Sequence, residues 1–202
     1  MNKNNKKLII ASQNRHKIEE FGKILSKYGF DVIGRDDANI PTGDVEETGK
    51  TFEENSLLKA GAIFDLSHTA TLADDSGLCV DFLDGAPGIY SARFAGDDTC
   101  DSKNNEKLLN LMEAADENER TARFVCVITL ILETGEKIVT RGECEGKIAR
   151  AETGKNGFGY DPLFIPNGYD VSMAQLPPDE KNKISHRAKA IEKLINKISK
   201  KI

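Results

Sequence analysis

A long alternating segment, residues 120–133, constrains the fold more than any other part of this chain. Every second residue from Ala122 to Leu132 is apolar, which is the period of a β-strand that buries one face. Thr134-Gly135 then provides turn residues, and residues 136–148 continue as a second strand. The sequence therefore predicts a long β-hairpin in this part of the chain.

Strands and helices succeed one another elsewhere. Residues 7–11 form a short apolar strand, Ser12-Gln13-Asn14 provide N-cap chemistry, and apolar residues at helical spacing follow up to Gly29. Three further helices are expected: one starting at Thr51, one over residues 99–115, and one from near Pro178 to Ile202. Because no repeat, linker or low-complexity segment interrupts this pattern, we expect one continuous α/β (α+β mixed) domain over residues 1–202.

Composition excludes several classes of protein. With 39% hydrophobic and 30% charged residues, the chain is expected to be globular. Its net charge of -5 argues against a nucleic-acid polymer as partner. Cys79, Cys100, Cys126 and Cys144 form no CxxC pair, so we expect no zinc site. No apolar run reaches transmembrane length and the start lacks a signal-peptide core, so we expect a cytoplasmic protein with no membrane partner.

The adjacent carboxylates of Asp74 and Asp75 are the strongest indication of chemistry. A short alternating strand, residues 69–72, is expected to end at this pair, and Ser76-Gly77 follow. Burying neighbouring carboxylates is costly unless a cation neutralises them, and Mg²⁺ that arrives with a phosphate is a common one. Asp-Ser-Gly is also ordinary turn chemistry. The segment alone leaves the metal site and the turn both open.

A second candidate site is the start of the first helix, Ser12-Gln13-Asn14-Arg15-His16-Lys17. Free backbone N–H groups and the helix dipole favour an anion there. Lys17 stands about one turn into the helix and can reach a phosphate. The glycines of a GxxxxGK phosphate loop are absent. The alternative interpretation is a plain N-cap followed by a surface lysine.

Acids and donors elsewhere add to these two segments. Glu46-Glu47 can supply oxygen ligands to Mg²⁺, and a solvated loop explains them equally. In the glycine-rich loop of residues 154–162, Phe158 can stack on a flat ligand such as a base. Lys181 and the His186-Arg187 pair can donate to phosphate or carbonyl oxygens. An exposed first turn of a helix is the alternative interpretation for these donors.

Together, and in this order, these segments resemble the inosine triphosphate pyrophosphatases, a family that hydrolyses non-standard purine nucleoside triphosphates. The resemblance spans most of the chain, from residue 12 to residue 187. The matching segments are Ser12-Gln13-Asn14-Arg15-His16-Lys17, Glu46-Glu47-Thr48-Gly49, Thr51-Phe52-Glu53-Glu54-Asn55, Ala73-Asp74-Asp75-Ser76-Gly77-Leu78, Gly85-Ala86-Pro87-Gly88-Ile89-Tyr90-Ser91-Ala92-Arg93, Gly157-Phe158-Gly159-Tyr160-Asp161-Pro162 and Ser185-His186-Arg187.

The resemblance implies a fold, a cofactor and a set of site residues. The implied fold is an elongated mixed β-sheet flanked by helices, with two lobes and the nucleotide in the cleft between them, and the implied assembly is a homodimer. Mg²⁺ is the implied cofactor, with Glu46 and Asp75 as ligands and Asp75 also as the catalytic proton acceptor. The implied substrate contacts, of which the first six hold the triphosphate, are Ser12, Gln13, Asn14, Arg15, His16, Lys17, Ser76, Phe158, Gly159, Tyr160, Asp161, Lys181, His186 and Arg187.

The implied activity is hydrolysis of ITP, dITP or XTP, which would clear deaminated purines from the nucleotide pool. Water attacks the α-phosphorus and pyrophosphate leaves. Lys17 and Lys181 would offset charge on the leaving oxygens, and Arg187 would donate to the 6-oxo group that adenine lacks. Bound Mg²⁺ would lower the pKa of Asp75 and make it a weak base. Two roles therefore stay open: either Asp75 positions a metal-bound water, or Asp74 or a neighbour shares the proton transfer. Two alternatives also remain: a septum-inhibitor-like pyrophosphatase acting on other modified nucleotides, and a nucleotide-binding sensor without hydrolysis.

Overall fold

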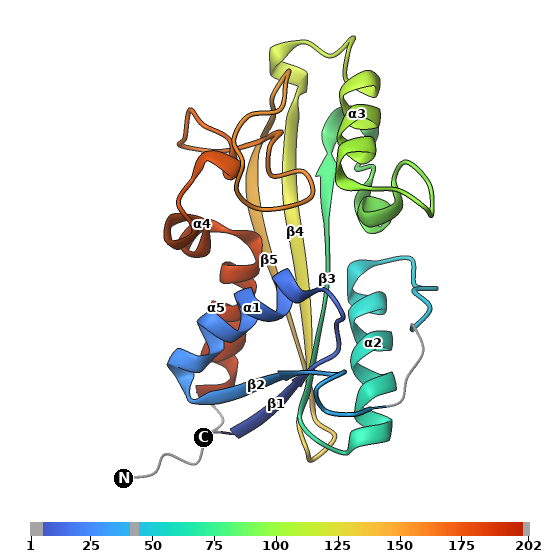
Figure 1. Cartoon of the computed structure of the whole chain (residues 1–202), viewed down its shortest axis with the longest axis vertical. Coiled ribbons are helices and arrows are strands. Elements are labelled where there is room, and N and C mark those ends of the chain that lie inside the picture. Colours follow the sequence, from blue (N-terminus) through green and yellow to red (C-terminus); the bar gives the residue numbers. More distant parts are fainter. Residues whose placement is uncertain (1–5, 41–44, 200–202) are drawn as a thin grey trace. The chain divides into compact units, whose positions relative to one another are not determined.

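The computed structural model describes residues 6–40 and 45–199. Within them the chain forms six strands and five α-helices, joined by turns and loops (Figure 1). The strands are β1 (Lys6–Ile10), β2 (Phe30–Gly34), β3 (Thr71–Val80), β4 (Thr121–Ile131), β5 (Lys137–Ile148) and β6 (Phe164–Pro166). The α-helices are α1 (Arg15–Leu25), α2 (Phe52–Ser67), α3 (Asp101–Leu111), α4 (Pro178–Ile184) and α5 (His186–Ser199). Within these described residues, no helix is long and apolar enough to span a membrane.

The strands form one mixed sheet in the order β2-β1-β3-β4-β5-β6, which confirms the predicted fold class. β1 pairs in parallel with β2, from Lys6 opposite Phe30 to Ile10 opposite Gly34, and in parallel with the start of β3. β5 pairs antiparallel with β6. The predicted β4–β5 hairpin is present and turns at Gly135, whose φ of 82° favours glycine. The parallel strands β1 and β2 end at the same edge, where α/β sheets bind their ligands.

The described residues divide into two compact units. The first takes its residues from segments 1–75, 126–142 and 190–202, and the second from segments 76–125 and 143–189. β3, β4, β5 and α5 each contribute residues to both units. The expectation of a single domain over the whole chain stays a prediction.

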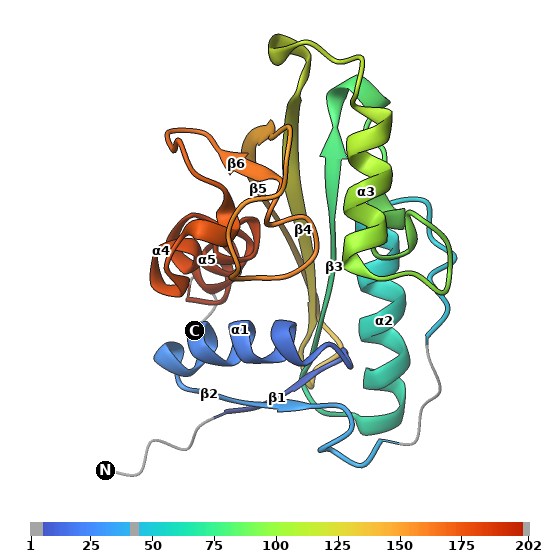
Figure 2. The same cartoon turned by 45° about the horizontal axis from the view of Figure 1, so that its top comes forward.

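In the first unit, helices cover both faces of the sheet. Alternate residues of a strand point to opposite faces. Leu8 and Ile10 of β1 accordingly join an apolar cluster with α1 and α5, while Ile9 joins a second cluster with α2. Figure 2 shows α1 lying along β2. A residue of a central strand therefore contacts either α1 and α5 or α2, depending on which face it points to.

The prediction of one continuous last helix from Pro178 is wrong. Ser185 separates α4 from α5 because its backbone is extended, with a ψ of 153°. Its hydroxyl accepts from the Ala188 N–H at 3.2 Å, so Ser185 is the N-cap of a new helix that begins at His186. Ile202, the expected end of the last helix, lies outside the described residues.

A buried arginine stabilises the second unit. Arg120 is 2% exposed, and its guanidinium donates to three backbone carbonyls: Met112 O at 2.8 Å, Ile148 O at 2.8 Å and Ala149 O at 2.9 Å. Met112 is the C-cap of α3, which stops at Leu111 rather than at the predicted residue 115. One side chain thus links the carbonyl at the end of α3, which also accepts from the Ala115 N–H, to the last carbonyl of β5 and the one after it.

We expect Arg120→Met to lower the free energy of unfolding by about 3 kcal/mol or more, since three carbonyls would lose a charged donor. Arg123→Met is the matched control, because Arg123 forms more exposed ion pairs with Asp81 and Glu145, which contribute less than about 1 kcal/mol each. Urea denaturation of both variants measures the difference. Equal losses would contradict the structural role given to Arg120.

Candidate active site

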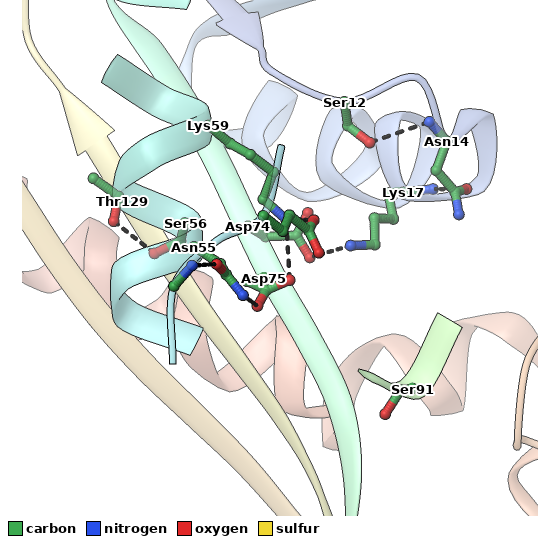
Figure 3. A network of polar contacts seen from close by, with 12 residues as sticks. Ser12, Asn14, Lys17, Asn55, Ser56, Lys59, Asp74, Asp75, Ser91 and Thr129 are labelled. Atoms are coloured by element: carbon green, nitrogen blue, oxygen red, sulfur yellow. Dashed lines mark hydrogen bonds and ion pairs between the residues drawn. The ribbon is translucent and has the colours of Figure 1, made fainter. Parts of the chain in front are cut away.

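The acid pair lies inside a strand rather than at its end. β3 runs from Thr71 to Val80, so the predicted strand end at Asp74 and Asp75 is wrong, and so is the turn interpretation. The pairing of β1 with β3 reaches Leu72, and β3 continues because β4 is its neighbour on the other edge. Adjacent residues of a strand point to opposite faces. Asp74 and Asp75 therefore meet different helices (Figure 3).

Asp74 meets the start of α1. Its carboxylate lies 3.0 Å from Lys17 Nζ, and the Asp74 side chain is fully buried. The predicted N-cap is confirmed: the Asn14 side chain accepts from the Lys17 N–H at 3.2 Å, and Ser12 Oγ accepts from the Asn14 N–H at 3.1 Å. Lys17 is not a plain surface lysine, because its side chain is 17% exposed and is paired with a buried acid.

Asp75 meets α2 on the other face. Lys59 Nζ donates to Asp75 Oδ1 at 3.0 Å and to Glu47 Oε1 at 2.7 Å. Asn55 Nδ2 donates to Asp75 Oδ2 at 3.2 Å. Asp75 is 5% exposed and Asn55 is fully buried. One ammonium therefore bridges two carboxylates. Both oxygens of Asp75 accept a hydrogen bond (Figure 3).

Burial and ion pairing act in opposite directions on this cluster. Burial raises the pKa of the Asp75 carboxyl, Lys59 lowers it and Glu47 raises it, and the result lies above the ordinary value. Burial lowers the pKa of Lys59, but the carboxylates of Asp75, Asp74 and Glu47 together raise it above its ordinary value. A carboxylate with a raised pKa is a stronger proton acceptor than an ordinary aspartate.

The segment that precedes α2 approaches the same cluster closely. Asn55 Oδ1 accepts from the Gly49 N–H at 2.8 Å. A Cβ on Gly49 would lie 2.5 Å from that oxygen, so a side chain at this position would displace Asn55. The contact fixes the backbone beside the two glutamates. Glu47 faces Lys59 there, whereas Glu46, the predicted metal ligand, is exposed.

Part of the predicted triphosphate segment lines a pocket of about 380 Å³ at the start of α1. Ser12, Gln13 and Arg15 line it together with Asp36 and Asp37, which follow β2. Gln13 and Arg15 are exposed. For the remaining member of the segment, the histidine at position 16, only the backbone is described. Arg15 and the two aspartates give the pocket both positive and negative charge.

A second cluster, within the second unit, gathers four of the predicted substrate residues. Lys181 Nζ lies 2.8 Å from Asp161 Oδ2 and 5.0 Å from the centroid of the Phe158 ring. The Arg187 guanidinium lies 5.9 Å from the same centroid. Asp161 Oδ2 also accepts from the Phe158 N–H at 2.9 Å. Two buried cations are thus within cation–π distance of one ring, and the interpretation of these donors as an exposed helical turn is wrong.

His186, Tyr160 and Ser76 are held differently. His186 is buried and stacks on Phe124, with ring centroids 4.9 Å apart and an interplanar angle of 14°. Tyr160 is buried, and its hydroxyl donates to Ser91 O at 2.8 Å. Burial raises the pKa of the Tyr160 hydroxyl, and the nearby Asp101 carboxylate raises it further. Ser76 is partly buried in β3, directly after Asp75.

Two residues of the Asp75 cluster, Asn55 and Lys59, were not anticipated from the sequence. They lie four residues apart on α2, in line with the N-cap Thr51, so all three share one face of the helix. A polar stripe of this kind on a helix that also carries apolar residues is the signal that could have found them. It leads directly to the buried carboxylate of Asp75.

Ligands of α/β proteins bind beyond the carboxyl ends of parallel strands, and Lys17 and Asp74 meet just past the end of the parallel β1–β3 pairing. This arrangement is that of an α/β protein with a charged ligand site. The chain belongs to the Ham1 family, whose model matches residues 8–197, and the resemblance inferred from its motifs is confirmed. Over 195 residues it is 50% identical to a dITP/XTP pyrophosphatase of Clostridium perfringens, covering 94% of this chain and 95% of that relative. It is 48% identical over 189 residues to a dITP/XTP pyrophosphatase of Oceanobacillus iheyensis, covering 94% and 96%.

Solved structures agree with the fold. The Staphylococcus aureus Ham1 protein matches with a TM-score of 0.86 at 45% identity, covering 98% of this chain and all of that one. A Ham1 protein from Coxiella burnetii matches with a TM-score of 0.87 at 40% identity, covering 96% and 99%. The chain is therefore similar to these proteins over nearly its whole length.

Proposed function

We propose that this chain hydrolyses non-standard purine nucleoside triphosphates, such as dITP, ITP and XTP, to the nucleoside monophosphate and pyrophosphate. The two dITP/XTP pyrophosphatases at 48% and 50% identity support this substrate class. The observation that carries the proposal is the cluster of Asp75, Lys59 and Glu47, in which a buried carboxylate of raised pKa lies beside an ammonium. Such an enzyme would clear deaminated purines from the nucleotide pool.

Mg²⁺ is the proposed cofactor. Among residues 6–40 and 45–199, no group of three or more His, Cys, Asp or Glu side chains could hold a metal ion. Mg²⁺ commonly takes one or two carboxylates and completes its shell with water and substrate phosphate, and Asp75 with Glu46 fits that requirement. When bound there, Mg²⁺ would neutralise charge on the triphosphate. Glu47, the chain neighbour of Glu46, is paired with Lys59, which also pairs with Asp75.

The proposed reaction breaks one phosphoanhydride bond. Water attacks the α-phosphorus, the bond from that phosphorus to the oxygen bridging it to the β-phosphorus breaks, and pyrophosphate leaves with that oxygen. Asp75 is the proposed acceptor of the proton from the attacking water. Burial raises the pKa of its carboxyl, which would oppose the lowering of that pKa by bound Mg²⁺. Lys17 and Lys59 offset negative charge on the phosphates, each already oriented by a buried carboxylate.

The second cluster is the proposed base-binding site. Phe158 stacks on the purine, and Arg187 donates to its 6-oxo group, where adenine instead carries an amino donor. We assign Lys181 to this site rather than to the leaving group, because its ammonium is held by Asp161 beside the Phe158 ring. The resemblance to inosine triphosphate pyrophosphatases supports His186, Ser76, Gly159 and Tyr160 as further substrate contacts.

A substrate panel tests the proposal. Pyrophosphate release with Mg²⁺ is measured for dITP, ITP, XTP, ATP, GTP and modified pyrimidine nucleoside triphosphates at matched concentrations. We expect the inosine and xanthosine nucleotides to be cleaved at least about tenfold faster than ATP, because an unpaired buried donor costs about 1–3 kcal/mol. Preferred cleavage of modified pyrimidine nucleotides would favour the septum-inhibitor-like alternative. Nucleotide binding without pyrophosphate release would favour the sensor.

We also propose that the protein acts in the cytoplasm as a homodimer, as the resemblance to its family implies. Tyr90 is 56% exposed and its ring lies 5.3 Å from the Arg93 guanidinium, which makes this pair a candidate contact between subunits. Light scattering on the purified chain measures the oligomeric state directly.

A further inference from the structure

Phe158 lies between two glycines in the loop that presents it. Gly157 and Gly159, on either side of Phe158, have φ values of 78° and 62°, in the region that favours glycine. Glycine adopts this region readily because it has no Cβ, and for the same reason its backbone is less restricted than that of other residues. Hydrogen bonds to the backbone on either side of Phe158 therefore help to keep its ring in one orientation.

Helix α3 supplies such contacts from two residues one turn apart. Asp101 Oδ2 accepts from the Gly159 N–H at 2.6 Å, and Asn105 Nδ2 donates to Gly159 O at 3.2 Å. Residues four apart lie on the same face of a helix, so one face of α3 holds both polar groups of Gly159. Asn105 is 2% exposed, which strengthens its hydrogen bond relative to one in water.

We propose that Asp101 and Asn105 are positioning residues that hold the Phe158 ring where it stacks on the purine base. The inference rests on the proposed function, in which Phe158 binds that base. The loop is also held from within, because Asp161 accepts from the Phe158 N–H. Because the backbone is fixed on both sides of Phe158, the ring is pre-organised. Less conformational entropy of the loop is then lost when the base binds.

A neighbouring residue provides a closely matched control. Asn104 is also buried, at 3% exposure, and its side chain accepts from the Ala95 N–H at 2.8 Å and donates to Ala92 O at 3.2 Å. Asn104→Ala and Asn105→Ala thus remove the same chemical group from the same helix, with similar burial. The first releases the backbone of residues 92–95, and the second releases Gly159.

The experiment compares base-bearing and base-free ligands. We expect Asn105→Ala to raise KM for dITP and XTP about tenfold, the upper effect of losing one buried hydrogen bond, with kcat little changed. The inhibition constant of inorganic tripolyphosphate, which has no base, should not change. Asn104→Ala should leave both constants near those of the wild type. Asp101→Ala should also raise KM. Asp101→Asn keeps an acceptor for the Gly159 N–H, so its KM should be close to that of the wild type.

Several outcomes would overturn the positioning role. These are an unchanged KM in folded Asn105→Ala, an equal rise in Asn104→Ala, or an equal weakening of tripolyphosphate. If Asn105→Ala does not fold, the exposed Asp101 carries the same test.

If the wild type cleaves neither dITP nor XTP, the proposed function fails by itself. Calorimetric affinities for dITP and tripolyphosphate in the same variants then still decide the role of α3.

Discussion

Asp75→Asn is expected to lower kcat for dITP by about a thousandfold, while the affinity for the nucleotide stays within a few-fold of the wild type. Asparagine has the same shape as aspartate but cannot accept the proton of the attacking water, and loss of a general base typically costs about 10² to 10⁴ in rate. It is also a weaker ligand for Mg²⁺. Single-turnover rates and equilibrium binding to the same protein separate the two effects.

Two further variants make this prediction specific. Asp65→Asn changes an exposed acid on α2 and should leave kcat unchanged. Asp74→Asn changes the acid on the opposite face, which is paired with Lys17. If Asp74→Asn loses as much activity as Asp75→Asn, the proton transfer is shared between the two acids. Full activity of Asp75→Asn would refute its assignment as the base.

Lys59→Met is expected to lower kcat/KM by about a hundredfold, because the triphosphate loses a pre-oriented positive charge. Methionine keeps most of the side-chain volume, so the loss is mainly one of charge. The variant should also lose about 3 kcal/mol of unfolding free energy at neutral pH, since it leaves two paired carboxylates, one of them buried, without their shared ammonium. Initial rates and urea denaturation measure the two losses.

The stability loss should depend on pH in a defined direction. Asp75 has a raised pKa in the folded state, so its contribution to stability is full below the unfolded pKa and is lost as pH rises through the folded pKa. Without Lys59, which lowers that pKa, the value rises further. The deficit of Lys59→Met should therefore be larger at about pH 8 than at about pH 4.

The control for this series is Lys27→Met, at an exposed lysine of the first unit. Its stability should differ from that of the wild type by less than about 0.5 kcal/mol at either pH. A deficit of Lys59→Met that is the same at both pH values would show that lost packing, rather than charge, is responsible.

Most of the fold could be predicted from patterns with a clear period. The alternation from Ala122 to Leu132 predicts β4, and Thr134-Gly135 predict its hairpin correctly. The break at Ser185 was missed because a serine can cap a helix or lie within one, and only the backbone distinguishes the two. The length of β3 was missed because the neighbour that extends it, β4, lies far along the chain.

The candidate site shows the same limit. Asp75, Lys17 and Asp161 were predicted from local motifs, and each forms an ion pair in the structure. Lys59 and Asn105 were not predicted, because each acts on a residue distant in sequence: Lys59 on Asp75 and Asn105 on Gly159. Contacts of this kind depend on tertiary packing, which single-sequence patterns do not encode.

Asp74 and Asp75 lie on opposite faces of one strand but are adjacent in it, so each is within electrostatic range of the lysine on the other face. Lys17, on the α1 face, affects the pKa of Asp75, and Asp74 in turn affects Lys59 on the α2 face. Replacing Lys17 should therefore change the pKa of Asp75, although Lys17 is paired with Asp74 and not with Asp75. The two faces of this sheet cannot be optimised independently.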